Sequence, residues 1–141
     1  MQLREVMTKK IENIAPQASL AEAAQRMKSL DVGALPVCDG DSLIGILTDR
    51  DITIRAVAEG CDPNITPVWQ AMTREVCWCR DDEDVKRAAE IMEEKQIRRL
   101  MVCDRDQHPV GIVSLGDIAT RTRDQKMSGE VLQEVSKPPQ H

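Results

Sequence analysis

The chain carries one sequence pattern twice, and this internal repeat restricts its possible folds more than any other feature. Residues 45–52 read Gly-Ile-Leu-Thr-Asp-Arg-Asp-Ile, and residues 111–118 read Gly-Ile-Val-Ser-Leu-Gly-Asp-Ile, an offset of 111 − 45 = 66. Val6-Met7-Thr8 returns as Ala71-Met72-Thr73 after 65 residues. A duplicated unit of about 60 residues explains both matches, because repeated supersecondary units leave such a periodic signature.

Each repeat contains the residue pattern of an amphipathic helix. Ser19 directly precedes this pattern in the first repeat and is a candidate N-cap, and Asp84 occupies the corresponding position in the second repeat. The apolar stripe follows the spacing i, i+3, i+4, i+7 of an amphipathic helix. Its members in the first repeat are Leu20, Ala23, Ala24 and Met27.

A strand pair follows the helix in both repeats. The runs 35–38 and 43–47 flank the turn pair Asp39-Gly40 and predict a hairpin, and the runs 100–103 and 110–113 predict a second one. We expect another helix to open at Asp51 and end at Gly60, with its counterpart beginning near Asp117.

These patterns predict an α/β (α+β) fold. We place the first repeat, with its linker, at 1–64, the second repeat at 65–124, and a polar tail with a short helix at 125–141. The linker is 61–67, which carries two prolines, and the tail helix is 129–135. Because one small sheet and a few helices cannot close a core alone, we expect the repeats to pack around a pseudo-two-fold axis and to leave two clefts.

Composition narrows the function classes. Phe and Tyr are absent, so only Trp69 and Trp78 could stack on bases, and the net charge of −5 includes no long basic block. We therefore expect no nucleic-acid binding. No apolar run is long enough for a membrane span or a signal peptide, which predicts a soluble cytoplasmic protein without membrane contact. The five cysteines are expected to be mostly reduced.

The paired motifs resemble the cystathionine β-synthase (CBS) domain family, in which two such repeats form a Bateman module. The resemblance spans residues 3–121 and rests on four features. These are the Val-Met-Thr and Ala-Met-Thr openings, Leu35-Pro36-Val37, the two Gly-apolar-apolar-Thr/Ser-x-x-Asp stretches, and Ile97-Arg98-Arg99-Leu100. The resemblance implies two small, mostly antiparallel sheets with packed helices and a homodimer of modules.

The resemblance also implies that an adenosine ligand (AMP, ADP, ATP or S-adenosylmethionine) binds in the clefts between the repeats. Matched position by position, it implies three groups of site residues. The ribose-binding residues are Thr48, Asp51, Ser114 and Asp117. The adenine-flanking residues are Leu35, Pro36, Leu100 and Met101. The phosphate-binding residues are Arg98, Arg99 and, more loosely, Arg50.

The chemistry of these residues suits such roles. An ionised carboxylate accepts both adjacent ribose hydroxyls, and Arg98 and Arg99 offer planar donors to a phosphate. The matching positions of the first repeat, Gly33 and Ala34, carry no charge, so the two sites should differ in phosphate affinity. If Asp51 opens a helix, the free amides there could also receive a phosphate.

Simpler interpretations stay open for each group. Thr/Ser-x-x-Asp is also a capping box, which closes a helix start without any ligand. Arg98 and Arg99 could instead pair with the surface acids Glu93 and Glu94.

The remaining candidates are Cys77, Cys79 and Trp78. Two thiols without further ligands at zinc spacing favour burial over a metal site. Trp78 could stack on adenine, although filling the core is the simpler role.

The sequence thus predicts a regulatory adenine-nucleotide module that is not an enzyme and requires no cofactor or metal. No nucleophile is matched with a base, and there is no P-loop. Such a module would signal to a partner protein by altered packing or dimer contact. The alternatives are a structural dimerisation module with vestigial clefts and a redox or metal sensor using Cys77 and Cys79.

Overall fold

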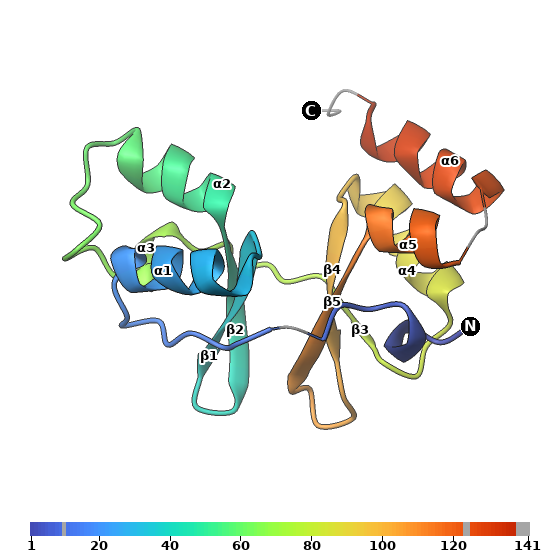
Figure 1. Cartoon of the computed structure of the whole chain (residues 1–141), viewed down its shortest axis with the longest axis horizontal. Coiled ribbons are helices and arrows are strands. Elements are labelled where there is room, and N and C mark those ends of the chain that lie inside the picture. Colours follow the sequence, from blue (N-terminus) through green and yellow to red (C-terminus); the bar gives the residue numbers. More distant parts are fainter. Residues whose placement is uncertain (10, 123–124, 138–141) are drawn as a thin grey trace. The chain divides into compact units, whose positions relative to one another are not determined.

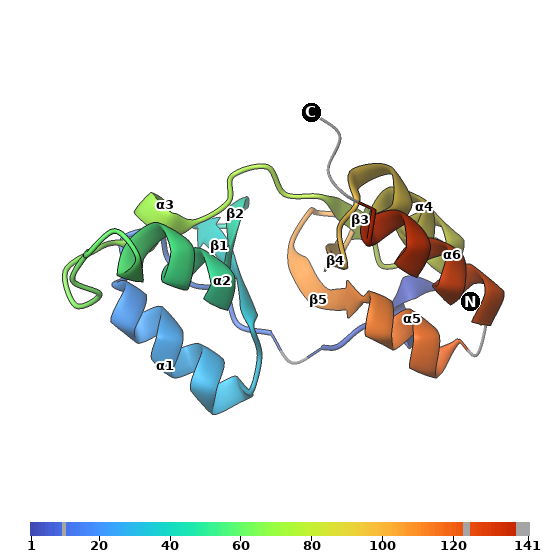
Figure 2. The same ribbon diagram turned by 90° about the horizontal axis from the view of Figure 1, so that it is seen from above.

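The computed structural model describes residues 1–9, 11–122 and 125–137, and the chain divides into two compact units (Figures 1 and 2). The continuous unit is Lys10–Val76, and the split unit combines Met1–Lys9 with Cys77–His141. The compact units therefore differ from the sequence repeats, since each repeat's opening segment packs in the other repeat's unit. The segment 61–67, which links the repeats in sequence, lies within the continuous unit.

Each unit is a mixture of short helices and one small sheet. The continuous unit contains α1 (Leu20–Leu30), β1 (Ala34–Asp39), β2 (Ser42–Thr48), α2 (Asp49–Ile52), the π-helical turn η2 (Thr53–Val57) and α3 (Val68–Ala71). The split unit contains the 3-10 turn η1 (Leu3–Glu5), β3 (Trp78–Arg80), α4 (Val85–Lys95), β4 (Arg99–Cys103), β5 (Pro109–Ser114), α5 (Leu115–Arg121) and α6 (Gln125–Val135).

The predicted first helices are confirmed together with their caps. The Ser19 side chain accepts a hydrogen bond from the Glu22 N–H at the start of α1, and Asp84 accepts one from the Lys86 N–H at the start of α4. Both helices end at a residue in the left-handed region, Asp31 after α1 and Gln96 after α4. The two helices thus begin and end by the same local devices.

The predicted hairpins are confirmed as antiparallel pairs with the same register. Ala34 pairs with Thr48 in the continuous unit, and Arg99 pairs with Ser114 in the split unit. The split unit adds β3, which runs parallel to β4. A single parallel bridge from Ile14 to Val37 holds the corresponding place in the continuous unit. The sheets are therefore mostly antiparallel, as expected.

Helix α6 sets the split unit apart. It begins at Gln125, earlier than the predicted 129–135, and Val131 is fully buried in the same cluster as Ala89 of α4. The tail helix is therefore docked on the core of the split unit. Ala24 of α1, which corresponds to Ala89, is exposed, so the predicted stripe of α1 is narrower. The rest of the predicted tail, from residue 138, lies outside the described residues.

Each unit has its own hydrophobic core. That of the continuous unit gathers Ile14, Leu20, Ala23, Met27, Leu35, Val37, Leu47, Ala56, Val68, Ala71 and Met72. That of the split unit gathers Leu3, Val6, Met7, Cys79, Val85, Ala88, Ala89, Met92, Leu100, Val102, Val113, Leu115, Ile118 and Val131. Met7 and Met72, from the exchanged opening segments, belong to these cores. The predicted pseudo-two-fold packing concerns the placement of the units and stays a prediction.

Candidate functional site

The first repeated motif closes the start of α2 as a reciprocal capping box. The Asp51 N–H donates to Thr48 Oγ1 at 3.0 Å, and the Thr48 N–H donates to Asp51 Oδ2 at 3.0 Å. Thr48 is the N-cap, so α2 opens at Asp49 and the prediction that it opens at Asp51 is wrong. Its helical run ends at Val57, and Gly60 follows in a turn with φ of 75°.

The second motif has the same geometry at the start of α5. The Asp117 N–H donates to Ser114 Oγ at 3.0 Å, and the Ser114 N–H donates to Asp117 Oδ2 at 2.9 Å. Ser114 is the N-cap and α5 opens at Leu115, ahead of Asp117. The duplication has therefore preserved the orientation of both carboxylates.

The capping boxes remove most of the helix amides that we expected to receive a phosphate. At α2, the Asp49 N–H donates to the Gly33 carbonyl and the Arg50 N–H to its neighbour's carboxylate. At α5, the Leu115 N–H donates to the Arg98 carbonyl. The expectation of a phosphate at the helix starts is therefore wrong for these amides, because protein oxygens already use them.

Each capping box uses only one of the two carboxylate oxygens of its aspartate, so the other oxygen has a different environment. Asp51 and Asp117 use Oδ2 for the box, and their side chains are 12% and 16% exposed. Within the described residues, Asp117 Oδ1 meets only the Arg121 Nε, at 4.0 Å. Asp51 Oδ1 also accepts a long hydrogen bond of 3.3 Å from the Thr73 hydroxyl. Asp117 therefore keeps the more available acceptor.

The exchanged opening segments lie directly against the motif glycines. A Cβ on Gly45 would lie 2.8 Å from Met72 Sδ and 2.9 Å from the Thr73 carbonyl oxygen. A Cβ on Gly111 would lie 2.6 Å from Met7 Sδ and 2.9 Å from the Thr8 carbonyl oxygen. Glycine is required here because the opening segment crosses the strand at backbone contact distance. This contact also explains the paired methionines.

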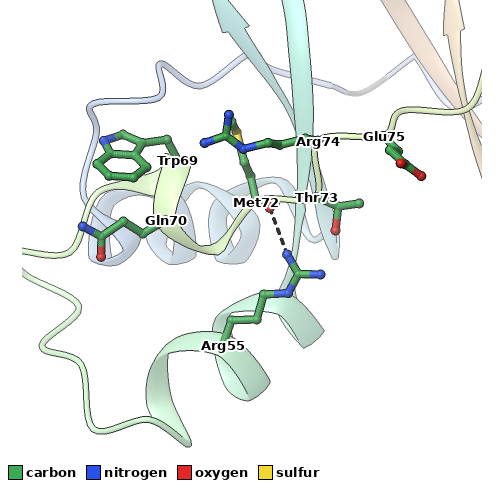
Figure 3. A pocket seen from close by; sticks show the side chains of 7 residues that line it. All are labelled: Arg55, Trp69, Gln70, Met72, Thr73, Arg74 and Glu75. Carbon is green, nitrogen blue, oxygen red and sulfur yellow. Dashed lines mark hydrogen bonds between the residues drawn. The ribbon is translucent and has the colours of Figure 1, made fainter.

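Two arginines that the sequence interpretation missed hold these segments in place. The Arg55 Nη1 donates to the Met72 carbonyl at 3.0 Å (Figure 3). The Arg121 Nη1 donates to the Val6 and Met7 carbonyls at 3.0 and 3.1 Å. Both lie four residues after the motif aspartate, and their offset of 66 was the signal that could have identified them.

The three predicted phosphate-binding arginines are exposed and divided between the units. Arg99 opens β4 and pairs in register with Ser114, while Arg98 precedes it and donates a long hydrogen bond of 3.5 Å to Ser136 Oγ. Arg50 lies on α2 beside Asp51. In the part of the chain that the structure describes, the side chains of Arg50 and Arg99 make no ion pair. Arg98 and Arg99 thus flank the second motif.

Strand alternation separates the predicted adenine-flanking residues into two pairs. Leu35 and Leu100 belong to the cores of their units. Pro36 and Met101 follow them on β1 and β4, and neither is a member of a core cluster. Because successive side chains point to opposite faces of a strand, Pro36 and Met101 lie on the sheet face opposite to Leu35 and Leu100, and both are buried there.

The cysteine pair has the environment of core thiols. Burial, with a smaller effect from Glu83, raises the pKa of Cys79 to about 12. Cys77 is half-buried and packs against the same core cluster. A thiol with so high a pKa is a poor nucleophile at neutral pH. Trp78 is 37% exposed, so the simpler expectation that it fills the core is wrong.

One other group of side chains has metal-ligand chemistry. Among the described residues, ligand atoms of Asp104, Asp106 and His108 lie within 4.8 Å of one another in the turn between β4 and β5. The Asp104 carboxylate accepts the backbone N–H groups of His108 and Asp106, and the pKa of Asp104 is lowered mainly by the His108 N–H. These hydrogen bonds build an Asx-type turn, which accounts for the grouping without an ion.

A comparison with known proteins places this architecture in a family. The family model of the CBS domain matches twice, at residues 3–57 and 68–123. The chain belongs to the CBS-domain family. It is 37% identical over 134 residues to the CBS domain-containing protein YhcV of Bacillus subtilis, a match that covers 95% of this chain and 94% of that one.

Solved CBS-domain structures show the same fold. A conserved CBS domain protein of unknown function from Thermoplasma acidophilum matches with a TM-score of 0.82 at 24% identity, covering 100% of this chain and 80% of that one. Hypoxic Response Protein I, a protein of Mycobacterium tuberculosis whose structure holds two coordinated zinc ions, matches with a TM-score of 0.74 at 35% identity, covering 86% and 98%. Within residues 1–9, 11–122 and 125–137, no helix of this CBS-domain chain has the length and apolarity needed to cross a bilayer.

Proposed function

We propose that the chain is a non-catalytic regulatory module that binds adenosine ligands (AMP, ADP, ATP or an S-adenosyl compound) through Asp51 and Asp117. The observation that carries this proposal is that the two oxygens of each carboxylate have different partners. Oδ2 closes the capping box, while Oδ1 of Asp117 has no hydrogen-bond donor among the described residues. The capping role and the ribose-binding role therefore do not compete.

The capping box would prepare the carboxylate for a ribose. Two reciprocal hydrogen bonds fix the side chain before any ligand arrives, so less rotamer entropy is lost on binding. A carboxylate oxygen has two acceptor lone pairs, so the adjacent ribose hydroxyls can be satisfied together. In the continuous unit, the Thr73 hydroxyl competes for Asp51, so we expect the second motif to bind more tightly.

Charge should direct phosphorylated ligands to the second motif. Arg98 and Arg99 stand beside Ser114, whereas Gly33 and Ala34 stand beside Thr48. Arg50 offers one cation near the first motif. We therefore propose that ATP favours the Ser114–Asp117 side, with Met101 as an adenine contact there and Pro36 in the same role beside the first motif. The expected location of the ligands between the repeats concerns the placement of the units and stays a prediction.

If the module forms a homodimer, ligand binding could be signalled by a change in the equilibrium between monomer and dimer. Ile54 and Val57, on the helical run after Asp51, are 50% and 60% exposed. Exposed aliphatic side chains on one helical run favour an interface with a second copy. A ligand would shift such an equilibrium only by its different affinity for the two states. Sedimentation analysis with and without ligand would measure this coupling.

Thermal melting with added ligand tests the proposal. A ligand at a hundred times its dissociation constant should stabilise the protein by ~2.7 kcal/mol. Asp117→Asn should abolish the stabilisation from the second motif, and Arg99→Ala should weaken ATP more than adenosine. Asp84→Ala is the matched control, because Asp84 caps α4 in the same unit without a ribose role.

Two outcomes would overturn the proposal. If AMP, ATP and S-adenosylmethionine all leave the melting temperature unchanged, the alternative of a structural dimerisation module with vestigial clefts is favoured. If Asp117→Asn lowers stability as Asp84→Ala does but keeps ligand affinity, the carboxylate is only a cap.

A further inference from the structure

A pocket of about 650 Å³ opens on the continuous unit, beside the contact between α3 and the helical run after Asp51. Its lining residues are Arg55, Trp69, Gln70, Met72, Thr73, Arg74 and Glu75 (Figure 3). The volume lies within the range of about 300–1,000 Å³ that small-molecule sites occupy. The lining combines an apolar wall, Trp69 and Met72, with two guanidinium groups.

The charge of the pocket differs from that of the chain. Two arginines and one glutamate line it, although the chain as a whole carries −5. Arg55 is held by the Met72 carbonyl and lies 3.9 Å from Asp51 Oδ1. Arg74 makes no hydrogen bond or ion pair with its side chain among the described residues, and in Figure 3 it extends back toward Trp69. The unpaired guanidinium favours an anionic ligand.

The duplication does not account for the pocket. Arg55, Met72 and Thr73 have counterparts in the split unit, which makes them part of the shared framework. The positions that correspond to Trp69 and Gln70 are Arg4 and Glu5, and both serve local structure there. Arg4 pairs with Asp81 at 3.7 Å, and the Glu5 carboxylate accepts the Gln2 N–H. The aromatic wall and the carboxamide are thus additions of the continuous unit alone.

We propose that this pocket binds a small organic phosphate, with its phosphoryl group at the Arg74 guanidinium and a planar ring against Trp69. Guanidinium groups match phosphate oxygens in a bidentate fork. The Trp69 side chain, 44% exposed, offers a ring surface on which a planar group can stack. This site lies beyond the proposed ribose function, because neither Asp51 nor Asp117 needs to touch the ligand.

Phenyl phosphate is the probe, since it carries the ring and the phosphoryl group but no ribose. In a Trp78→Phe variant, Trp69 is the only fluorophore, because the chain has two tryptophans. We expect a saturable change in Trp69 fluorescence with phenyl phosphate, and weaker binding of inorganic phosphate or phenol. Calorimetry on the wild-type chain gives the same affinities without the tryptophan substitution.

Arg74→Gln should weaken phenyl phosphate by roughly tenfold or more, the effect of losing a charged hydrogen bond. Lys28→Gln is the control, because Lys28 is an exposed cation of α1 in the same unit and its side chain makes no ion pair among the described residues. Asp117→Asn should leave this binding unchanged, which separates the result from that of the adenosine proposal. The inference is overturned if no saturable signal appears, if phenol binds as tightly, or if Lys28→Gln weakens binding as much as Arg74→Gln.

Discussion

Replacing Gly45 by alanine tests the contact between the exchanged segment and the first motif. The new methyl group would lie 2.8 Å from Met72 Sδ and 2.9 Å from the Thr73 carbonyl oxygen. The thioether can move, but the backbone oxygen belongs to a pair of hydrogen bonds with Ile46. Overpacking of this kind costs typically 1–3 kcal/mol. We expect the upper part of that range, which lowers Tm by roughly 5 °C or more in a chain of this size.

Urea unfolding followed by circular dichroism measures the loss. Gly129→Ala is the matched control, because a Cβ there meets nothing within 4 Å and the site lies in α6. That variant should be unchanged or more stable by up to ~1 kcal/mol, the helix preference of alanine over glycine. Gly111→Ala should behave like Gly45→Ala, since its Cβ would lie 2.6 Å from Met7 Sδ.

The double variant Gly45→Ala with Met72→Ala separates the two contacts. Removing the thioether should relieve part of the strain. The double variant should therefore lose less free energy of unfolding than the sum of the two single losses, with a coupling of about 0.5–3 kcal/mol. The reasoning is refuted if Gly45→Ala is as stable as the wild type, or if the two losses are simply additive.

Three further predictions concern other parts of the chain. Arg121→Ala should cost about 1 kcal/mol or more, because two partly buried carbonyls lose their donor, and amide hydrogen exchange at residues 6–8 should rise while that of α4 does not. Val131→Ala should cost about 2 kcal/mol because the side chain is fully buried in the core, whereas Leu132→Ala, half-exposed on the same helix, should stay within about 0.5 kcal/mol, and equal losses would contradict the docking of α6. The pKa of Cys79 is raised to about 12 in the folded chain, so the folded state holds its proton longer than the unfolded state, and stability should fall as pH rises above about 9. Between pH 8 and 10, the urea midpoint of unfolding should fall less steeply in Cys79→Ala than in the wild type. An identical slope would show that Cys79 is not the cause of this pH dependence.

Local features of the fold could be predicted because their physical cause lies within a few residues. Ser19 and Asp84 act as N-caps for the helices directly behind them, and the first hairpin turns at residues 40–41, so that Asp39 of the predicted turn pair is the last residue of β1. The start of α2 was misplaced because the aspartate of a capping box occupies the third helical position and Thr48 is the cap. The π-helical turn at Thr53–Val57 has no local sequence signal.

Nonlocal contacts could not be predicted in this way. Met7 touches Gly111 across more than a hundred residues, and only the structure assigns the opening segments to opposite repeats. The extent of α6 depends on the burial of Val131 against α4 and α5 rather than on its own polar sequence. For the candidate site, the motif aspartates were identified, but Arg55, Arg121 and the Trp69 pocket depend on that same exchange.

The exchange of opening segments has a consequence for the ancestry of the chain. A single repeat carries the glycine strand near one end and the Met-Thr segment at the other, yet the two are not partners within one compact unit. Two identical half-length chains could complete each other by trading these segments, which is the form of a domain-swapped homodimer. Gene fusion of such halves would convert that trade into the single chain seen now. A half-length protein made from residues 1–66 should therefore assemble as a dimer rather than fold as a monomer.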